Sequence, residues 1–157
     1  MMDNFLRPDD GSGISVLFVC TGNTCRSPLA EYCLKYLSDE KIRAASAGLH
    51  AFEGEAMNKN SLTVLAENGI DGSRFRSRNV AFDMTERASL ILTMTRMQKL
   101  ELITRFPQAA DKCRLLAEIS GGGEIPDPFG GSLEIYRQTW EKIRQNVEIW
   151  LAALTRR

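Results

Sequence analysis

The stretch "ISVLFVCTGNTCRSPLAE", residues 14–31, carries a strand signal and a helix signal joined by a short polar loop. Its first seven residues, 14–20, are mostly apolar and β-branched and predict a buried strand. Ser27 followed by Pro28 is typical of an N-cap and the first turn of a helix, so a helix is expected over 28–40. Its expected core-facing residues are Leu29, Cys33, Tyr36 and Leu37. A strand that runs through a tight loop into a helix is a unit of α/β folds.

The remaining chain repeats this alternation of strands and helices. Further strands are expected over 42–48, 88–95 and 111–119, and helices over 55–68, 96–106 and from 133 onward. The last helix has an apolar stripe at helical spacing that predicts packing on a core. The stripe consists of Leu133, Tyr136, Trp140, Ile143, Val147, Trp150 and Leu154. The pattern predicts an α/β fold of three layers, a parallel sheet with helices on both faces.

Size and composition limit the class of protein. The 157 residues, 43% of them hydrophobic, fit one globular domain, expected over 14–157 after a flexible tail over 1–13. That tail lacks the apolar segment of a signal peptide, and no apolar run is long enough to span a membrane. Basic and acidic residues number 20 each, which argues against a broad nucleic-acid or anionic-membrane surface. Four cysteines are too few for a secreted disulfide framework, so we expect a cytoplasmic protein with reduced thiols.

The loop between the first strand and the first helix has the composition of an anion site. Unpaired backbone N–H groups and the helix dipole attract an anion to a helix N-terminus. Gly22 and Asn23 tolerate left-handed backbone angles, which lets successive N–H groups curl into a nest. The same positive field favours a thiolate at Cys20, and Arg26 adds a planar fork of donors for phosphate oxygens. Ser27 is placed to cap the helix and to donate its hydroxyl to the sulfur.

A thiolate in an oxyanion cradle predicts nucleophilic phosphoryl transfer, which also needs a proton donor for the leaving group. The best candidate is Asp127 in the loop "GGGEIPDPFGG", residues 121–131. Pro126 and Pro128 stiffen its backbone, and the glycines let the loop fold over a pocket. Phe129 would supply an apolar wall. The alternative for Phe129 is a plug of the core beneath the loop.

These segments resemble the low-molecular-weight protein tyrosine phosphatases. The resemblance rests on "VLFVCTGNTCRSPLAE", on "SAG" at 46–48 and on "DPFGGSLEIYRQT". It implies a four-stranded parallel sheet, a phosphorylated protein as substrate, and neither a cofactor nor a metal. In the family mechanism Cys20 would be the nucleophile, Arg26 the phosphate clamp and Asp127 the general acid. The residues expected to bind substrate or hold the loop are Thr21, Gly22, Asn23, Thr24, Cys25, Ser27 and Phe129.

Within that family the chain most resembles the bacterial protein arginine phosphatases. Tyrosine-directed members usually have Ile or Leu at the position of Thr24, and a Tyr or Trp soon after the Asp-Pro. We therefore expect hydrolysis of phosphoarginine through a cysteinyl-phosphate intermediate, with phosphotyrosine as the alternative substrate. One departure is Phe75, at a position where the family often has a histidine. It weakens the expectation of a histidine-supported hydrogen-bond network behind the loop.

Other functions and roles fit the sequence less well. An arsenate reductase of the thioredoxin-coupled branch needs a further pair of neighbouring cysteines, whereas Cys33 and Cys113 are isolated and expected in the core. A non-catalytic phosphoprotein-binding module would need neither a nucleophile nor an acid. A zinc site is not expected, because the cysteine spacing is wrong. Cys25 is open to two interpretations, packing or a reversible disulfide with Cys20. His50 is expected to be a loop residue rather than a catalyst.

Overall fold

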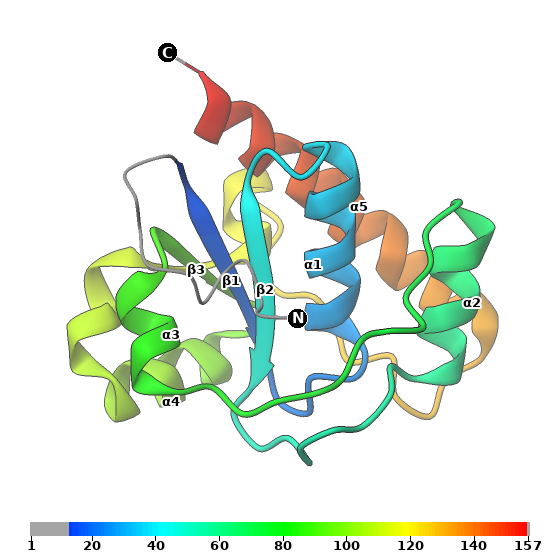
Figure 1. Ribbon diagram of the computed structural model, residues 1–157, viewed down its shortest axis with the longest axis horizontal. Helices are drawn as coiled ribbons and strands as arrows, with labels where there is room; N and C mark the ends of the chain where they lie inside the picture. The colour runs from blue at the N-terminus through cyan, green and yellow to red at the C-terminus, as the bar shows by residue number, and fades with distance from the viewer. Residues whose placement is uncertain (1–12, 157) are drawn as a thin grey trace.

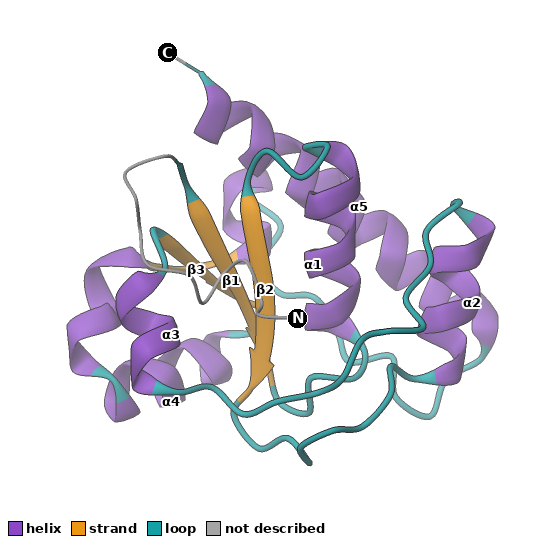
Figure 2. Ribbon diagram, viewed as in Figure 1, coloured by secondary structure: helices purple, strands orange, loops and turns teal. Residues whose placement is uncertain are grey.

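A computed structural model describes residues 13–156 and contains one four-stranded sheet. The strands are β1 (Ser15–Cys20), β2 (Arg43–Gly48), β3 (Leu90–Thr93) and β4 (Cys113–Leu115). They are ordered β2-β1-β3-β4, and every neighbouring pair is parallel. Their carboxyl ends therefore meet at one edge of the sheet, the lower edge in Figure 2. The predicted four-stranded parallel sheet is confirmed.

Helices cover both faces of the sheet (Figure 1). One face carries α1 (Arg26–Leu37), α2 (Lys59–Glu67) and α5 (Leu133–Thr155), and the other carries α3 (Phe82–Arg87) and α4 (Arg96–Arg105). Short 3-10 helices over Pro107–Lys112 and Leu116–Ser120 flank β4. The arrangement is the predicted three-layer α/β fold. No helix within residues 13–156 is long and apolar enough to cross a membrane.

The side chains on the two faces of β1 belong to two separate hydrophobic cores. Val16, Phe18 and Cys20 belong to the core beneath α1 and α5, while Leu17 and Val19 belong to the core beneath α3 and α4. All of them are buried because β1 lies inside the sheet with helices on both sides, which explains its continuous apolar run. The predicted stripe on α5 also packs on the first core. Its fully buried members are Tyr136, Trp140, Ile143 and Val147.

Several local predictions are wrong in detail. Helix α1 begins at Arg26 and not at Pro28, so Cys25 occupies the N-cap position in place of Ser27. Tyr36, which was predicted to face the core, is exposed, whereas Leu34 is buried in the core. Helix α2 begins only at Lys59, because the side chain of Asn58 caps it by accepting the backbone N–H of Asn60. The fourth strand ends at Leu115, where a 3-10 helix takes over, and the short helix α3 was not predicted. The tail predicted for residues 1–13 lies, apart from Gly13, outside the described residues.

The packing of α5 leads to a stability prediction. Ile143 is fully buried between the helix and the sheet, whereas Ile149 on the same helix is 41% exposed. We expect Ile143→Ala to lower the free energy of unfolding by about 2–5 kcal/mol, because the core cannot fill the lost volume. Ile149→Ala is the matched control and should change it by no more than about 0.5 kcal/mol. Urea unfolding of both variants measures the difference, and equal losses would contradict the packing described.

Candidate active site

The segment 21–25 forms a tight loop at the carboxyl edge of the sheet, between the end of β1 and the start of α1. Asn23 adopts a left-handed backbone with φ of 55°. Gly22, which was expected to share this conformation, does not have a positive φ. The turn into the helix therefore depends on Asn23, one of the few residue types that tolerate this region.

The end of β2 supports the loop at very short range. A Cβ atom at Gly48 would lie 2.7 Å from the carbonyl oxygen of Thr21 and 2.9 Å from the Cβ of Ala51. Gly48 also pairs directly with Cys20 across the sheet. Only a glycine allows the loop to pass this close, which gives a physical reason for the last residue of the "SAG" segment.

The side chain of Asn23 links the loop to two other segments. Its Nδ2 donates to Ser27 Oγ at 2.9 Å and to Ser46 Oγ at 3.0 Å. Its Oδ1 accepts the backbone N–H of Arg78 at 2.9 Å. Because a backbone N–H can only donate, this contact fixes which end of the amide is the oxygen. These three hydrogen bonds fix the orientation of the Asn23 side chain.

A buried carboxylate stands behind this network. Glu31 on α1 is only 6% exposed, and its Oε1 accepts the hydroxyl of Ser46 at 2.6 Å. Its Oε2 accepts from Lys35 Nζ, also at 2.6 Å, one turn along the helix. A buried carboxylate needs such a charged partner, because burial without one is costly. None of Glu31, Lys35 and Ser46 was predicted to support the site.

Ser27 lies directly against the sulfur of Cys20. The Ser27 Oγ and Cys20 Sγ atoms are 2.9 Å apart, and both residues are buried. Ser27 does not cap the helix as expected, since it sits in the first turn of α1. Its predicted contact with the sulfur is present. Since the Ser27 oxygen already accepts from Asn23, its own proton is available for a thiolate at Cys20.

Arg26 projects from the first residue of α1 toward the loop that carries Asp127. Its NH1 donates to the carbonyl oxygen of Ile125 at 3.0 Å, and its NH2 lies 3.8 Å from Asp127 Oδ2. Arg26 is 5% exposed, and its Nε has no hydrogen-bond partner within the described residues. A buried guanidinium N–H without an acceptor is costly. A phosphate oxygen in the pocket would satisfy it, as in bidentate Arg–phosphate pairs.

Asp127 is held in a shaped loop and remains accessible. Its Oδ1 accepts the backbone N–H of Phe129 at 3.0 Å, and its side chain is 57% exposed. A Cβ at Gly131 would lie 2.9 Å from the carbonyl oxygen of Pro128, so the loop closes tightly behind the acid. Phe129 is 74% exposed, and the interpretation of this residue as a core plug is therefore wrong.

These residues surround a pocket of about 310 Å³. It is lined by Cys20, Thr21, Gly22, Asn23, Thr24, Cys25, Arg26, His50, Phe52, Glu55, Asp127 and Phe129. The structure thus brings together every predicted site residue except Ser27, which lies behind the sulfur of Cys20. His50 occupies a loop, as predicted, with its Nε2 2.6 Å from Glu101 Oε2. Phe52 and Glu55 were not predicted to line the pocket.

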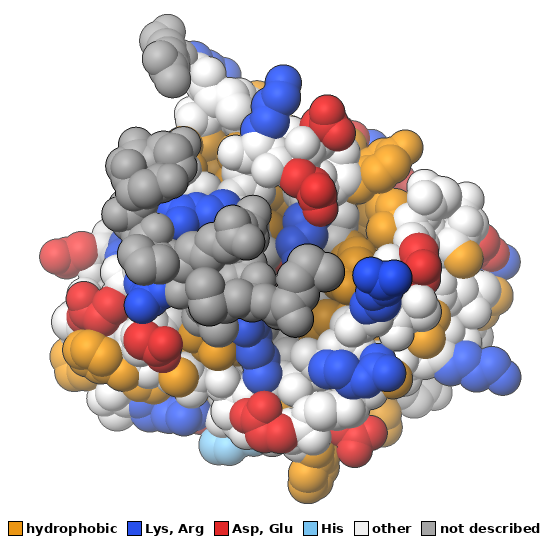
Figure 3. All heavy atoms as spheres, in the orientation of Figure 1, with side chains coloured by type: hydrophobic (Ala, Val, Ile, Leu, Met, Phe, Trp, Pro, Cys, Tyr) orange, Lys and Arg blue, Asp and Glu red, His pale blue; other side chains and the backbone are white. Residues whose placement is uncertain are grey.

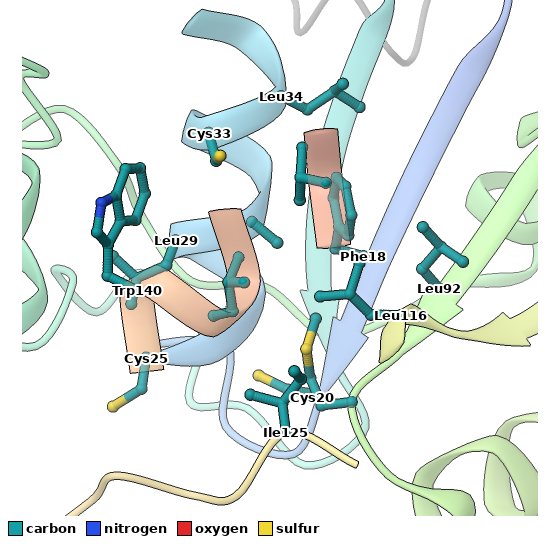
Figure 4. Packing of buried hydrophobic residues seen from close by; sticks show 14 of the residues in the cluster. Phe18, Cys20, Cys25, Leu29, Cys33, Leu34, Leu92, Leu116, Ile125 and Trp140 are labelled. Carbon is teal, nitrogen blue, oxygen red and sulfur yellow. The ribbon is translucent and has the colours of Figure 1, made fainter. Parts of the chain in front are cut away.

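The other cysteines differ from Cys20 in their surroundings. Burial raises the pKa of the Cys25 thiol, whose sulfur lies 3.4 Å from the hydroxyl of Tyr136. Figure 4 shows that this sulfur points away from Cys20. Burial also raises the pKa of Cys33 to about 12 and of Cys113 to about 11, and both are core residues as predicted. Packing of Cys25 is confirmed, while its reversible disulfide with Cys20 stays a prediction.

The arrangement can bind a tetrahedral oxyanion and place a nucleophile beneath it. Loop N–H groups at the start of α1 and the fork of Arg26 supply donors, and Cys20 lies at the floor with a hydroxyl donor behind it. Asp127 stands at the mouth, where it can exchange a proton with a leaving group. The geometry fits phosphoryl transfer to a cysteine.

Comparisons with known proteins agree with this geometry. A family model described as low molecular weight phosphotyrosine protein phosphatase matches residues 15–157. A protein-arginine-phosphatase of Geobacillus stearothermophilus is 37% identical over 135 residues, which cover 85% of this chain and 90% of that protein. The tyrosine phosphatase PtpB of Staphylococcus haemolyticus is 39% identical, with 82% and 91% covered. The solved structure of the YwlE arginine phosphatase from G. stearothermophilus superimposes with a TM-score of 0.86 at 36% identity, covering 90% of this chain and 92% of that one.

The contact between Ser27 and Cys20 leads to a prediction about reactivity. We expect Ser27→Ala to slow alkylation of Cys20 by iodoacetamide about tenfold or more. A hydrogen bond to a charged acceptor contributes about 1.5–3 kcal/mol, and the thiolate is the reactive form. The alkylation rate is measured by mass spectrometry of the Cys20 peptide.

Ser61→Ala is the matched control, because the Ser61 hydroxyl is buried and has no hydrogen-bond partner in the described part of the chain. It should leave the rate of alkylation unchanged. If both variants react at the rate of the unmodified protein, Ser27 does not stabilise the thiolate.

Proposed function

We propose that this chain, which belongs to the family of low molecular weight phosphotyrosine protein phosphatases, hydrolyses phosphoarginine residues of a protein substrate. The chain is a cysteine-dependent protein phosphatase by family, and its relatives include both arginine and tyrosine phosphatases. The observation that carries the choice of phosphoarginine is the identity of one side chain in the loop over 21–25. That side chain is Thr24, which lines the pocket.

In the proposed mechanism the Cys20 thiolate attacks the phosphorus atom and forms an S–P bond. The P–N bond to the guanidine breaks, and Asp127 gives its proton to the leaving nitrogen. Water then attacks the phosphorus, Asp127 takes up a proton from that water, and the S–P bond breaks to release inorganic phosphate. Arg26 and the loop N–H groups balance the charge of the phosphoryl oxygens in both steps. No cofactor or metal takes part.

The position of Thr24 supports the choice of substrate. Its backbone carbonyl accepts the N–H of Asn58 at 2.9 Å, which holds the residue in place, and its Oγ1 is 4.0 Å from Cys25 Sγ. A guanidinium is planar and polar, and each of its N–H groups needs an acceptor once water is excluded. Asp127 can accept from it, while Thr24 packs beside it without the bulk of an isoleucine.

Phosphotyrosine is the second candidate substrate. The two exposed rings of Phe52 and Phe129 border the pocket and could stack on an aromatic side chain. PtpB, at 39% identity, is named as a tyrosine phosphatase. Asp127 would then protonate a phenolate oxygen in place of a guanidine nitrogen, and the remaining steps would be unchanged.

The role of Asp127 leads to a kinetic prediction. We expect Asp127→Asn to lower kcat by about 100- to 10,000-fold for a substrate with a poor leaving group, the usual contribution of a general acid. The loss should shrink for an aryl phosphate whose leaving group needs no proton. Steady-state kinetics with both substrates measure this.

Two cysteine variants serve as controls for that experiment. Cys20→Ser should be inactive toward both substrates yet still bind phosphate, since the backbone of the loop remains. Cys25→Ser should keep most of the activity. An Asp127→Asn variant with equal losses on good and poor leaving groups would remove the acid from the mechanism.

The specificity prediction rests on Thr24. We expect Thr24→Ile to shift the ratio of kcat/KM from phosphoarginine toward phosphotyrosine by tenfold or more. An unpaired buried donor costs about 1–3 kcal/mol, and about 1.4 kcal/mol corresponds to tenfold. Thr24→Val keeps the size of the threonine and removes only its hydroxyl, so it separates the effect of bulk from that of polarity.

Matched phosphoarginine and phosphotyrosine peptides provide the measurement. A smaller shift in Thr24→Val than in Thr24→Ile would assign the effect to bulk. An unmodified enzyme that prefers phosphotyrosine would overturn the proposed substrate and leave the second candidate.

A further inference from the structure

A second hollow of about 420 Å³ opens beside the phosphate pocket, along α4. The two hollows have Thr21, Arg26, His50 and Asp127 in common, so they form one continuous depression. We define the part beyond these shared residues as the α4 groove, lined by Leu49, Thr95, Met97, Gln98, Leu100 and Glu101. A substrate chain that places its phosphorylated side chain in the pocket can therefore continue into this groove.

The α4 groove contains an exposed apolar surface. Met97 is 74% exposed and Leu100 is 61% exposed, while Leu49, which also lines the groove, is buried. Residues three apart lie on the same face of a helix, so Met97 and Leu100 form one surface on α4. Figure 3 shows one face of the molecule, on which apolar side chains are scattered among charges of both signs. Exposed apolar side chains gathered at a depression mark a binding surface.

The polar groups of the groove are already occupied by neighbours within the protein. The Oε2 of Glu101 lies 2.6 Å from His50 Nε2 and 3.4 Å from Arg105 NH1. Gln98 accepts the backbone N–H groups of Met94 and Thr95 and donates to Thr21 Oγ1. Glu101 and Gln98 already have partners within the protein, so the groove offers mainly apolar contact to a bound chain.

We propose that the α4 groove docks an apolar side chain of the protein substrate, located a few residues from the phosphorylated residue. The proposal rests on the proposed function only in that the substrate is a phosphorylated protein chain. An extended chain advances about 3.3 Å per residue, so a side chain roughly two to four positions away reaches a hollow that adjoins the pocket. Leucine or methionine fits this surface, because contact with Met97 and Leu100 buries apolar area on both partners.

The test uses phosphopeptides that differ in one position. Each peptide carries the same phosphorylated residue, with either leucine or serine placed in turn at each of the neighbouring positions on both sides. We expect leucine at one position to raise kcat/KM by about 5- to 20-fold over serine, because the groove would partly bury one apolar side chain. The double variant Met97→Ser, Leu100→Ser should abolish that preference.

Two controls separate docking from damage to the site. Turnover of a small aryl phosphate, which cannot reach the groove, reports the chemistry alone and should be the same in the double variant. Ile149→Ser removes an exposed apolar side chain from α5, outside both hollows, and should leave the leucine preference intact. A preference that survives in the double variant would overturn the proposal, as would the absence of any preference in the unmodified enzyme.

Running the series with phosphoarginine and with phosphotyrosine distinguishes this inference from the proposed substrate. A leucine preference that depends on α4 only in the phosphotyrosine peptides would support the groove and reject phosphoarginine. Phosphoarginine turnover without any leucine preference would support the substrate and reject the groove.

Discussion

The side-chain amide of Asn23 ties together three segments that are far apart in the sequence. It donates to Ser27 at the start of α1 and to Ser46 in β2, and it accepts the N–H of Arg78 from the loop before α3. The residue is fully buried and has a left-handed backbone, so the same side chain sets both the turn of the loop and its anchoring. The shape of the phosphate pocket depends on this constraint, since every N–H of the nest follows from the path of the loop.

Glu31 and the backbone N–H of Arg78 together decide the direction of these hydrogen bonds. A carboxylate can only accept, so Ser46 must donate its proton to Glu31 and can then only accept from Asn23. With Oδ1 fixed by a backbone N–H, the second amide proton of Asn23 goes to Ser27, whose own proton is left for Cys20. From Asn23, one run of hydrogen bonds therefore points through Ser27 toward the Cys20 sulfur. The other points through Ser46 toward the Glu31 carboxylate. A hydroxyl that donates to the sulfur stabilises the thiolate over the thiol.

Sequence patterns predicted the parts of the site that are local in the chain. The strand, the loop and the helix that place Cys20 and Arg26 follow one another directly, and proline and glycine spacing marked the loop of Asp127. The supporting contacts were not predicted, because they depend on the register of β2 against β1 and on where the loop near Ile125 meets Arg26, 99 residues away. A carboxylate on the buried face of a helix was the one available signal for Glu31.

The wrong helix start and the missed helix have local causes. Ser27 matches the preferred residue type for a cap, but its hydroxyl contacts Asn23 and Cys20 instead, and the helix begins two residues earlier than predicted. Helix α3 has only six residues, Phe82–Arg87, which is too short for an apolar period to be visible. At Ser27, tertiary contacts therefore outweigh the local preference of serine for the cap position.

Phe75 stands where the resemblance to the family predicts a histidine, and it packs as an apolar side chain next to the network. Phe75 is buried and its ring packs edge-on against Tyr32, with centroids 6.2 Å apart. Lys35 takes a position against both Glu31 and the Tyr32 ring, with its Nζ 5.3 Å from the ring centroid. The counter-charge of the buried carboxylate therefore comes from the same helix, four residues away. The loop over 72–80 also reaches the network through Arg78, whose backbone N–H donates to Asn23 and whose Nε donates to the carbonyl oxygen of Ser46 at 3.1 Å, so these contacts are made without a histidine.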